Sequence, residues 1–469
     1  MGATYEIVCT VLRRTRIFLL VFVLVAGGVL AGLALTGEDS PPSFGPVTID
    51  PSKPDPFGYE ASRDQEFVDR ATAGNSHVLY AKSPGGVLAT ARRVARWRPQ
   101  IEAAAGDTDP DLLEAIVFLE SAGNPDARPS DDLEGAVGLT QILAGTASSL
   151  LGMHVDVAAS QRLTRRMERR GPSARLLRQR RRVDERFDPR KALEGAARYL
   201  AIARQRFGRE DLAVVSYHMG IGNLESVLDA YGDRDATWAR VFFDATPLNH
   251  PRAQALIAGF GDDSSTYLWR VYAAREIMRL YRDDPAALRR RAELETAKAS
   301  AEEVLHPRAQ TKVFETPGQL DDAYRSGELR PFEGIEGMRV DPQMGELAHR
   351  LDAEQRLYRG LRPRAYELAA YLAAGVRNVS GSRAPLFVTS TVRDQRYQRL
   401  LERDNPFATR EYSLHTTGYA FDVRRDYASR RQAVAFQYML DRLASLNLIA
   451  WVREPGAIHI TASGEDVLQ

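Results

Sequence analysis

The sequence predicts a multidomain protein with an N-terminal transmembrane helix, an all-α domain and a small α+β domain towards the C-terminus. Three observations support this fold class. An uncharged apolar run occupies residues 17–35, helical periodicity without strand-like alternation fills about 86–285, and the β-rich segment LFVTST starts only at Leu386. The 469 residues allow two or three domains. The single cysteine, Cys9, excludes an intramolecular disulfide framework.

The apolar run near the N-terminus has the length of a membrane anchor. Three arginines precede Ile17, and the uncharged stretch to Leu35 nearly spans a bilayer core of about 30 Å. The basic flank predicts that the N-terminus stays inside and the rest of the chain outside. A cleaved signal peptide is the alternative, because Ala31 and Ala34 are small. The formal net charge of +1 gives no global case for a nucleic acid partner.

The composition divides the chain further. A segment rich in Pro, Ser and Asp follows the anchor, as expected of a linker, and a charged connector follows the helical region. The expected parts are a cytoplasmic N-terminus (1–16), the anchor (17–36), a linker (37–85), the helical domain (86–285), a helical and irregular connector (286–344) and the α+β domain (345–469).

One helix in the all-α domain carries a candidate catalytic acid. Asp109 is a natural N-cap, Pro110 suits the first helical position, and the helix must stop near Asn124-Pro125. Glu120 then lies in the last turn beside apolar residues, where burial would raise the pKa of its carboxyl and suit it to general acid catalysis. An ordinary solvated glutamate at a helix end is the alternative reading.

Three motifs follow in a fixed order along the chain. They are Glu120-Ser121, then Gly135-x-x-Gly138-Leu139-x-Gln141-Ile142, then Ser216-Tyr217-His218-Met219-Gly220-x-Gly222-Asn223, with Phe187-Asp188-Pro189 leading into a helix between the last two. Together they resemble the catalytic domain of the soluble-type lytic transglycosylases, lysozyme-like enzymes that cut bacterial cell-wall glycan. The resemblance covers roughly residues 101–232. It implies a lysozyme-like fold, with peptidoglycan strands as the substrate and no cofactor.

The resemblance also implies a role for each matching residue. Glu120 would act first as acid and then as base, while the 6-hydroxyl of N-acetylmuramic acid attacks its own anomeric carbon and leaves a 1,6-anhydro sugar. The residues implied in substrate binding are Ser121, Gly138, Gln141, Tyr217 and Asn223.

Several alternatives stay open for this domain. A second carboxylate from Asp131, Asp132 or Glu134 would make the enzyme a hydrolysing muramidase. Tyr217 can also be read as a half-buried core tyrosine. His218 and Met219 replace the Asn and Ala of the family motif, which puts substrate contacts in doubt but not Glu120.

The arginine-rich segment 161–182 lies between the second and third motifs. It reads either as a solvated helix face or as a patch that binds anionic wall polymers or lipid head groups.

The α+β domain contains a second group of chemically active residues. Two histidines and an aspartate, His415, Asp422 and His459, have the composition of a catalytic zinc site. Ser413-x-His415-x-x-Gly-x-Ala-x-Asp422 resembles the zinc D,D-carboxypeptidases and D,D-dipeptidases that act on peptidoglycan stem peptides. The resemblance covers about residues 383–461 and implies a Zn²⁺ cofactor held by these three ligands. Three unrelated polar residues in a small α+β domain are the alternative.

The same resemblance implies roles for three further residues. Arg393 would stabilise the oxyanion or hold the substrate carboxylate, Glu454 would be the general base, and Ser413 would contact substrate. In the familiar enzymes the base lies three residues before the last histidine, where this chain has Gly456. Glu454 lies five residues before His459. Five and three are both odd spacings, so Glu454 would face the same side of a strand as a residue at the family position.

Both resemblances indicate the same polymer. The sequence therefore predicts a bifunctional peptidoglycan-remodelling enzyme, anchored in the cytoplasmic membrane with its catalytic domains in the periplasm or cell wall. Its partners would be glycan strands, stem peptides and the membrane, with no nucleic acid. The alternatives are a C-terminal domain that only binds the wall, a non-catalytic scaffold and a phage-type lysin.

Overall fold

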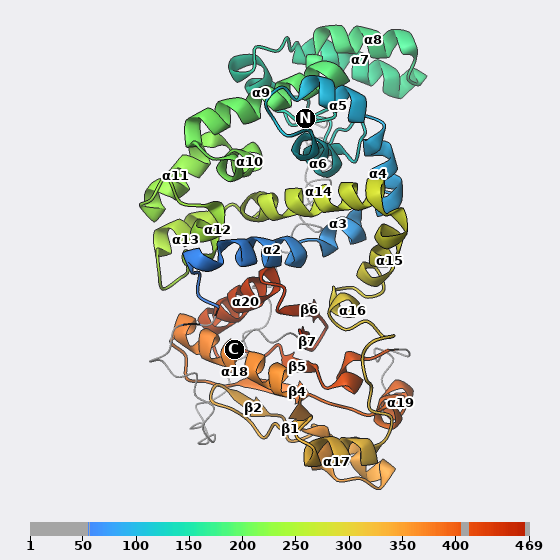
Figure 1. Ribbon diagram of the computed structural model, residues 1–469, viewed down its shortest axis with the longest axis vertical. Coiled ribbons are helices and arrows are strands. Elements are labelled where there is room, and N and C mark those ends of the chain that lie inside the picture. Colours follow the sequence, from blue (N-terminus) through green and yellow to red (C-terminus); the bar gives the residue numbers. More distant parts are fainter. Residues whose placement is uncertain (1–54, 56, 405–411, 465–469) are drawn as a thin grey trace, which may run out of the picture. The chain divides into compact units, whose positions relative to one another are not determined.

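The computed structural model describes residues 55, 57–404 and 412–464, which divide into two compact units (Figure 1). A helical unit begins at Phe57 and extends to Val304, and an α+β unit holds most of the residues from Leu305 onward. The anchor expected at 17–36 lies outside the described residues. Within the described ranges, no helix is both long enough and apolar enough to cross a membrane.

The first unit is built from helices, and its described residues contain no strand longer than an isolated bridge. Its short helical turns are η1 (Ala61–Arg63), η2 (Thr146–Leu150), η3 (Glu185–Phe187) and η4 (Asp263–Thr266). Its α-helices are α2 (Asp64–Gly74), α3 (His77–Lys82), α4 (Val87–Ala95), α5 (Arg98–Ala104), α6 (Pro110–Ser121), α7 (Val157–Arg170), α8 (Ala174–Val183), α9 (Pro189–Phe207), α10 (Glu210–Met219), α11 (Ile221–Tyr231), α12 (Trp238–Asp244), α13 (Pro251–Gly259), α14 (Tyr267–Asp283) and α15 (Pro285–Glu295).

The capping signals in the sequence correctly locate two helices of this unit. Asp109 caps α6 by accepting a hydrogen bond from the backbone N–H of Asp111, and Pro110 is its first residue. Asp188 caps α9 in the same way through the N–H of Lys191. The end of α6 comes slightly before the expected Asn124-Pro125, because Ala122 adopts a left-handed conformation with φ 51°.

The helical unit is larger at both ends than the sequence indicates. The interval 37–85 was expected to be a linker, yet α2 and α3 occupy much of its second half and contribute buried residues such as Phe67 and Tyr80. The expected connector 286–344 is also divided: α15 belongs to the helical unit, whereas residues from Leu305 belong to the α+β unit. These segments contain few apolar residues, so their sequence pattern does not indicate that they pack against a core.

The α+β unit has a five-stranded sheet with the strand order β2-β4-β5-β7-β6, and a separate two-stranded pair of β1 and β3. Its strands are β1 (Arg330–Pro331), β2 (Met338–Val340), β3 (Gly360–Leu361), β4 (Leu386–Ser390), β5 (Ala420–Arg424), β6 (Ile449–Arg453) and β7 (Ala457–Ala462). Its helices are α17 (Pro317–Arg325), α18 (Pro363–Ser380), α19 (Gln395–Asp404) and α20 (Arg430–Ser445), with turns η5 (Glu346–Leu351), η6 (Gln355–Tyr358) and η7 (Leu414–Thr417); α16 (Glu302–Leu305) spans the boundary in sequence.

The pairing of the sheet places two predicted metal ligands side by side. β5 and β7 are antiparallel, with Asp422 directly opposite His459. Directly opposed residues point to the same face of a sheet, so both side chains emerge on one face. The neighbours Phe421 and Ile460 are likewise paired and almost fully buried. The strand predicted at Leu386–Thr391 is confirmed as β4.

Candidate active sites

The first candidate site is organised by Glu120 in the last turn of α6. The preceding turns are anchored in the core through Leu113, Ile116 and Val117, which are fully buried. The left-handed residue Ala122 then ends the helix directly after Glu120-Ser121. The acid is therefore carried by a rigid element and lies where the chain leaves the helix, which is a suitable position for a group that must meet a substrate.

The environment of Glu120 favours the protonated carboxyl. Burial raises the pKa of Glu120 to about 7, and a hydrogen bond from the Tyr267 hydroxyl opposes this rise. That hydroxyl donates to Glu120 Oε1 at 2.6 Å. Tyr267 is the first residue of α14, which packs against α6. A carboxyl with this pKa can give up and recover a proton near neutral pH.

Two other tyrosines surround this pair. Tyr217 of α10 donates from its hydroxyl to the carbonyl oxygen of Thr140 at 2.7 Å, and its ring stacks on Tyr267 with centroids 6.4 Å apart and planes 7° from parallel. Tyr199 of α9 contacts Tyr217 edge-on at 5.2 Å. Tyr217, for which the sequence implied a role in substrate binding, thus lies beside the residue that holds Glu120. Its hydroxyl also ties α10 to the loop that follows α6.

The loop from Leu133 to Ile142 is held by one buried arginine. Arg186 is 1% exposed and forms a salt bridge with Asp184 at 2.9 Å. Its guanidinium also donates to the carbonyl oxygens of Leu133 at 2.7 Å, Gly135 at 2.9 Å and Ile142 at 3.3 Å. One side chain thus satisfies three carbonyls of a loop that has no regular secondary structure. The loop is therefore rigid without belonging to a helix or sheet.

Gly138 and Gln141 have specific backbone roles in this loop. Gly138 has φ 80°, and a Cβ at this position would lie 2.0 Å from the carbonyl oxygen of Arg186. Gln141 also has a positive φ, 49°, and its amide nitrogen donates to the carbonyls of Ala127 and Gly138. The resemblance implied that Gln141 binds substrate. In the structure both N–H groups of this amide are used inside the loop.

The structure places the other predicted residues in supporting positions. The hydroxyl of Ser121 donates to the carbonyl of Val117 within α6, and the amide of Asn223 donates to the carbonyl of Met219, tying α11 to the end of α10. His218, which departs from the family motif, lies 2.9 Å from the Ser264 hydroxyl and contacts the ring of Tyr267 at 5.0 Å.

The three acids proposed as a second carboxylate, Asp131, Asp132 and Glu134, are all exposed. The carboxylate of Asp132 accepts from the backbone N–H of Glu134, so this acid serves a local turn.

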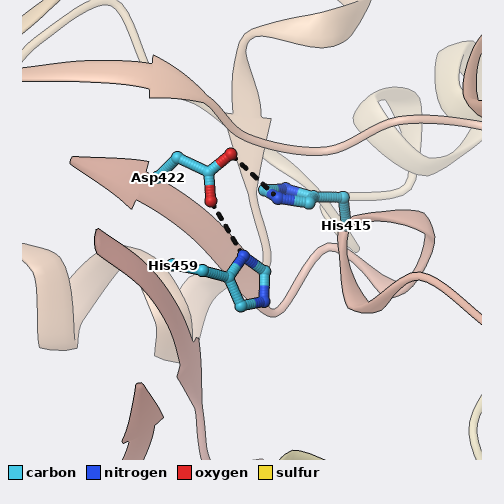
Figure 2. A group of neighbouring side chains, drawn as sticks. All are labelled: His415, Asp422 and His459. Carbon is cyan, nitrogen blue, oxygen red and sulfur yellow. Dashed lines mark hydrogen bonds and ion pairs between the residues drawn. The ribbon is translucent and has the colours of Figure 1, made fainter. Parts of the chain in front are cut away.

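The second candidate site lies in the α+β unit, where His415, Asp422 and His459 converge (Figure 2). His415 comes from the turn η7, Asp422 from β5 and His459 from β7. Asp422 lies between the two histidines: Oδ2 is 3.2 Å from His415 Nε2, and Oδ1 is 2.8 Å from His459 Nδ1. The potential ligand atoms all lie within 4.8 Å of one another. The structure thus brings together the three residues that the sequence singled out.

Burial and hydrogen bonding set the protonation of this cluster. The Nδ1 atom of His415 lies 2.8 Å from the carbonyl oxygen of Thr391, which fixes the proton on Nδ1 and leaves a lone pair on Nε2. Burial and, secondarily, the charge of Arg393 lower the pKa of His415 to about 4. The pKa of Asp422 is held well below its usual range by the two histidines, against the effect of burial. A neutral imidazole and an ionised carboxylate are the forms that bind a metal ion.

These residues fit a zinc ion by their chemistry. Two imidazoles and one carboxylate make a three-ligand set of the type found in catalytic zinc sites. The carbonyl of Thr391 also supplies the outer hydrogen bond that such histidines usually have. The buried, preorganised cluster needs no rearrangement of its strands to bring the donors together.

Arg393 lies beside this cluster and faces a small cavity. Its guanidinium donates to Ser390 Oγ at 2.6 Å and lies 3.5 Å from Asp422 Oδ2. Its backbone N–H donates to the carbonyl of His415 at 3.0 Å. The cavity has a volume of about 240 Å³, and its walls include Met344, Leu347, Ser390, Arg393 and Tyr397. A cation thus lies at the wall of a small hollow next to the histidines.

The remaining predicted residues of this site differ in their placement. Ser413 is buried, and its carbonyl accepts hydrogen bonds from the backbone and hydroxyl of Thr416, so it shapes the turn that carries His415. Glu454 is exposed in the hairpin between β6 and β7, where its backbone N–H donates to the carbonyl of Ala457. Val452 pairs with His459, so Glu454 has the parity of the site face. Its charge also acts on Arg393, opposing the lowering of that pKa by burial.

Sequence reasoning missed two residues of the first site. Tyr267 is not among the residues that the sequence analysis singled out, and Arg186 was passed over in favour of the Phe187-Asp188-Pro189 motif beside it. The only signal for Tyr267 in the sequence was its position, a tyrosine directly at the start of an apolar helix. No signal in the sequence indicated that Arg186 would turn inward among so many exposed arginines.

Comparison with known proteins agrees with the geometry of the helical unit. Residues 99–238, which lie within the helical unit, match the family profile described as the transglycosylase SLT domain. This range includes Glu120, Tyr217 and the loop held by Arg186. It does not reach the histidine cluster.

Curated relatives lead to a more particular likeness. The chain is 29% identical over 217 residues to the endo-type membrane-bound lytic murein transglycosylase A of Klebsiella pneumoniae (strain 342), covering 42% of this chain and 90% of that protein. Proteins of the same name from Salmonella paratyphi B (strain ATCC BAA-1250 / SPB7) and Salmonella enteritidis PT4 (strain P125109) are each 28% identical with the same coverage.

Proposed function

We propose that the helical unit is a lytic transglycosylase that cleaves the bond between N-acetylmuramic acid and N-acetylglucosamine in peptidoglycan. The observation that carries this proposal is the setting of Glu120: one carboxyl on a rigid helix end, with its pKa raised to about 7 and its Oε1 held by Tyr267. The SLT domain match and the named activity of the relatives support the same substrate.

The reaction needs only one carboxyl when the nucleophile is part of the substrate. Glu120 gives its proton to the leaving oxygen as the glycosidic C1–O bond breaks. The 6-hydroxyl of the same muramic acid then forms the new O6–C1 bond and passes its proton to Glu120, which restores the acid. No water is consumed, and the product ends in a 1,6-anhydro ring. Tyr267 orients the carboxyl, and the rigid loop around Gly138 forms one wall for the sugar.

A mass-spectrometric digest of purified peptidoglycan tests this proposal. The full chain should release anhydro-muropeptides, and Glu120→Gln should reduce them by at least about 10²-fold. Glu134→Gln is the matched control, because this exposed acid lies in the following loop, and it should retain activity. Reducing-end products would instead indicate a muramidase that uses one of the acids Asp131, Asp132 or Glu134. No cleavage by any variant would leave the non-catalytic scaffold as the better reading.

We also propose that the α+β unit is a zinc peptidase of the D,D-carboxypeptidase type acting on stem peptides. The convergence of His415, Asp422 and His459 carries this second proposal. Zinc bound by these three residues supplies Lewis-acid polarisation at the scissile amide. Arg393 offers a guanidinium for a substrate carboxylate or for developing negative charge, and the cavity beside it has room for a small side chain. Glu454 is the proposed base.

The test of this activity separates an enzyme from a wall-binding module. Stem peptides should be shortened by the full chain, and His415→Ala or a chelator should abolish the shortening. Zinc content, measured by elemental analysis, should fall from one ion per chain to none in His415→Ala. His349→Ala, an exposed histidine of the same unit, should keep its zinc. One zinc per chain with intact stem peptides would make this unit a metal-stabilised binding module.

We propose a membrane location for the enzyme. The apolar run before residue 36 and the membrane-bound relatives support an anchored protein with both units outside the cytoplasm. Release of the chain from membranes by detergent but not by salt or carbonate would be the expected behaviour.

A further inference from the structure

The hairpin of α7 (Val157–Arg170) and α8 (Ala174–Val183) contributes no residue to either candidate site. These two helices lie side by side at one end of the helical unit, joined by a short turn (Figure 1). Residues 157–183 contain ten arginines and one acid, a formal charge of +9, whereas the whole chain carries +1. The other residues therefore sum to −8, and the chain concentrates its positive charge on this hairpin.

The exposed arginines form stripes on the outer sides of the two helices. On α7 they recur at three- and four-residue spacing, opposite the buried face of Ser160, Thr164 and Met167. The eight exposed arginines are Arg162, Arg165, Arg166, Arg169, Arg170, Arg175, Arg178 and Arg182. Within the described residues, none of these eight forms an ion pair. Their charges are thus available to an external anion.

Other charged groups of the hairpin differ from the eight exposed arginines because they have partners elsewhere in the helical unit. Arg180 is buried, pairs with Asp126 and stacks on the ring of Phe187 at 3.8 Å. The one acid, Glu168, is exposed, but it pairs at 3.0 Å with Arg128, which lies outside the hairpin. The hairpin is thereby fixed to the unit through its inner face, and its outer face is a rigid array of cations. A purely solvated face would need neither this excess of one sign nor its concentration.

The chemistry of the array indicates what it binds. All its cations are arginines, whose planar forks suit phosphate oxygens. Residues 157–183 contain no aromatic side chain, so the surface lacks the platforms on which bases stack. The apolar face of each helix is already packed inward, so the hairpin has nothing to insert between acyl chains. The hairpin surface can therefore recognise a partner only by its charge. This charged surface is about 21 Å long, the length of α7.

We propose that the outer face of the α7–α8 hairpin docks on a membrane surface containing anionic phospholipids. Two antiparallel rows of cations match the distributed phosphates of a lipid surface better than a single polymer strand. Electrostatic attraction of this kind acts within about a Debye length and needs no apolar contact. The contact would hold the catalytic unit near the membrane independently of any N-terminal anchor.

The experiment reports on the hairpin itself, so an anchor common to all variants does not affect it. The full chain carries Cys9→Ser and Ala174→Cys, and a donor dye is attached at residue 174, the exposed first residue of α8. The chain is reconstituted in phosphatidylcholine vesicles, with or without one-third phosphatidylglycerol, that contain an acceptor on the headgroup. Energy transfer should be greater with phosphatidylglycerol and should fall to the neutral-lipid level at about 1 M salt, where the Debye length is about 3 Å.

Two matched variants distinguish an effect of the hairpin arginines from an effect of the net charge of the chain. Replacing Arg165, Arg166, Arg169 and Arg170 with Gln should reduce the preference for anionic lipid by about tenfold or more. The control replaces four exposed arginines elsewhere in the helical unit, Arg92, Arg96, Arg252 and Arg289, with Gln and should retain the preference. Unfolding temperatures of both variants check that the hairpin stays folded.

Three results would overturn the proposal. Equal energy transfer in both lipids would exclude a lipid-specific contact, and equal loss in both quadruple variants would reduce the effect to net charge. Retention of the full chain on peptidoglycan sacculi or on single-stranded DNA is measured in parallel. A hairpin-dependent retention there, without a vesicle signal, would assign the surface to a wall polymer or a nucleic acid instead.

Discussion

Glu120 acquires its acid character from its neighbours, because a glutamate side chain by itself titrates far below neutral pH. Burial raises the pKa of Glu120 to about 7, and the hydroxyl of Tyr267 moderates that rise. Glu134 lies fourteen positions later, in the loop that follows α6, and is exposed. The two residues therefore have the same chemistry and different environments, which makes them a useful pair for experiment.

The first prediction concerns the pH dependence of stability. The folded pKa of Glu120, about 7, lies above the unfolded value of 4.5. The folded state therefore binds more protons than the unfolded state between these two pKa values. The contribution of Glu120 to the free energy of unfolding is fully present below about pH 4.5 and is lost as the pH rises through 7. Glu120→Gln removes that loss. The variant should match the wild type near pH 4 and melt on the order of 5 °C higher near pH 8.

Differential scanning calorimetry at the two pH values measures this effect, with Glu134→Gln as the control that follows the wild type. A constant difference between Glu120→Gln and wild type across the pH range would contradict a raised pKa.

The second prediction concerns Tyr267. Its hydrogen bond lowers the pKa of Glu120, so Tyr267→Phe should raise that pKa further. The acid must be protonated at the start of the reaction, and activity therefore falls as the pH rises through the pKa. The alkaline fall of kcat/KM, expected near pH 7 in the wild type, should move to higher pH in Tyr267→Phe. Tyr281→Phe, on the same helix and partly buried, should leave the profile in place.

At the level of elements, the loop between α6 and α7 depends on Arg186 rather than on its own backbone bonding. The three carbonyls that this side chain binds belong to Leu133, Gly135 and Ile142. Without this arginine the carbonyls and the buried carboxylate of Asp184 would lose their partner. A buried group left unpaired costs more than the paired contact contributes, so the arginine is essential to the loop even if the ion pair adds little net stability.

The third prediction follows directly from this loop. Arg186→Met should lower the free energy of unfolding of the helical unit by about 3–5 kcal/mol, because it leaves the buried Asp184 without its ion-pair partner. Arg190→Met, which breaks an exposed pair with Glu194, should cost less than about 1 kcal/mol. Denaturant unfolding monitored by tryptophan fluorescence measures both, since three of the four tryptophans lie in this unit. Similar losses of unfolding free energy in the two variants would show that the hydrogen bonds from Arg186 to the loop carbonyls are unimportant.

The fourth prediction uses two glycines with the same backbone conformation. Gly138 has φ 80° and Gly152 has φ 63°, so alanine is strained at both. A Cβ at Gly138 would also meet the carbonyl of Arg186, whereas Gly152 has nothing within 4 Å. Gly152→Ala should cost about 1 kcal/mol and retain activity, and Gly138→Ala should cost clearly more and reduce cleavage. Equal effects on stability and digestion would show that the close approach at Gly138 is unimportant.

At the scale of the whole molecule, the chain carries two candidate sites on two separate cores. Each core carries the residues of its own candidate site, so substitution in one site should leave the other intact. Glu120→Gln should preserve zinc binding, and His415→Ala should preserve anhydro-muropeptide release. The proposed activities would then act on the glycan and the peptide of one polymer from a single chain.

The fifth prediction concerns removal of the metal. Zinc that binds only the folded α+β unit stabilises it by mass action, by about 3–4 kcal/mol at 100 to 1,000 times the dissociation constant. A chelator should therefore lower the melting temperature of this unit by several degrees and leave the helical unit unchanged. His459→Ala should remove the response to chelator, and His349→Ala should retain it. A chelator effect on the helical unit would place the metal elsewhere.

Local signals in the sequence determined much of this protein. Caps at Asp109 and Asp188 located α6 and α9, and the motif around His415 and Asp422 named two residues that the structure brings together with His459. The boundary of the helical unit was wrong, because α2 and α3 lack a strong apolar pattern. Such signals succeed where the responsible atoms lie within a few residues of one another.

Only the tertiary structure decided how these residues are tuned. Tyr267 reaches Glu120 across 147 positions of sequence, and Arg186 binds carbonyls more than forty positions away. Burial, and therefore the raised pKa of Glu120, depends on α14 packing against α6. The sequence alone determined which residues could be an acid, a ligand or a cap, because these are properties of a side chain and its near neighbours. Packing decided which of them are desolvated and paired, because that depends on distant parts of the chain.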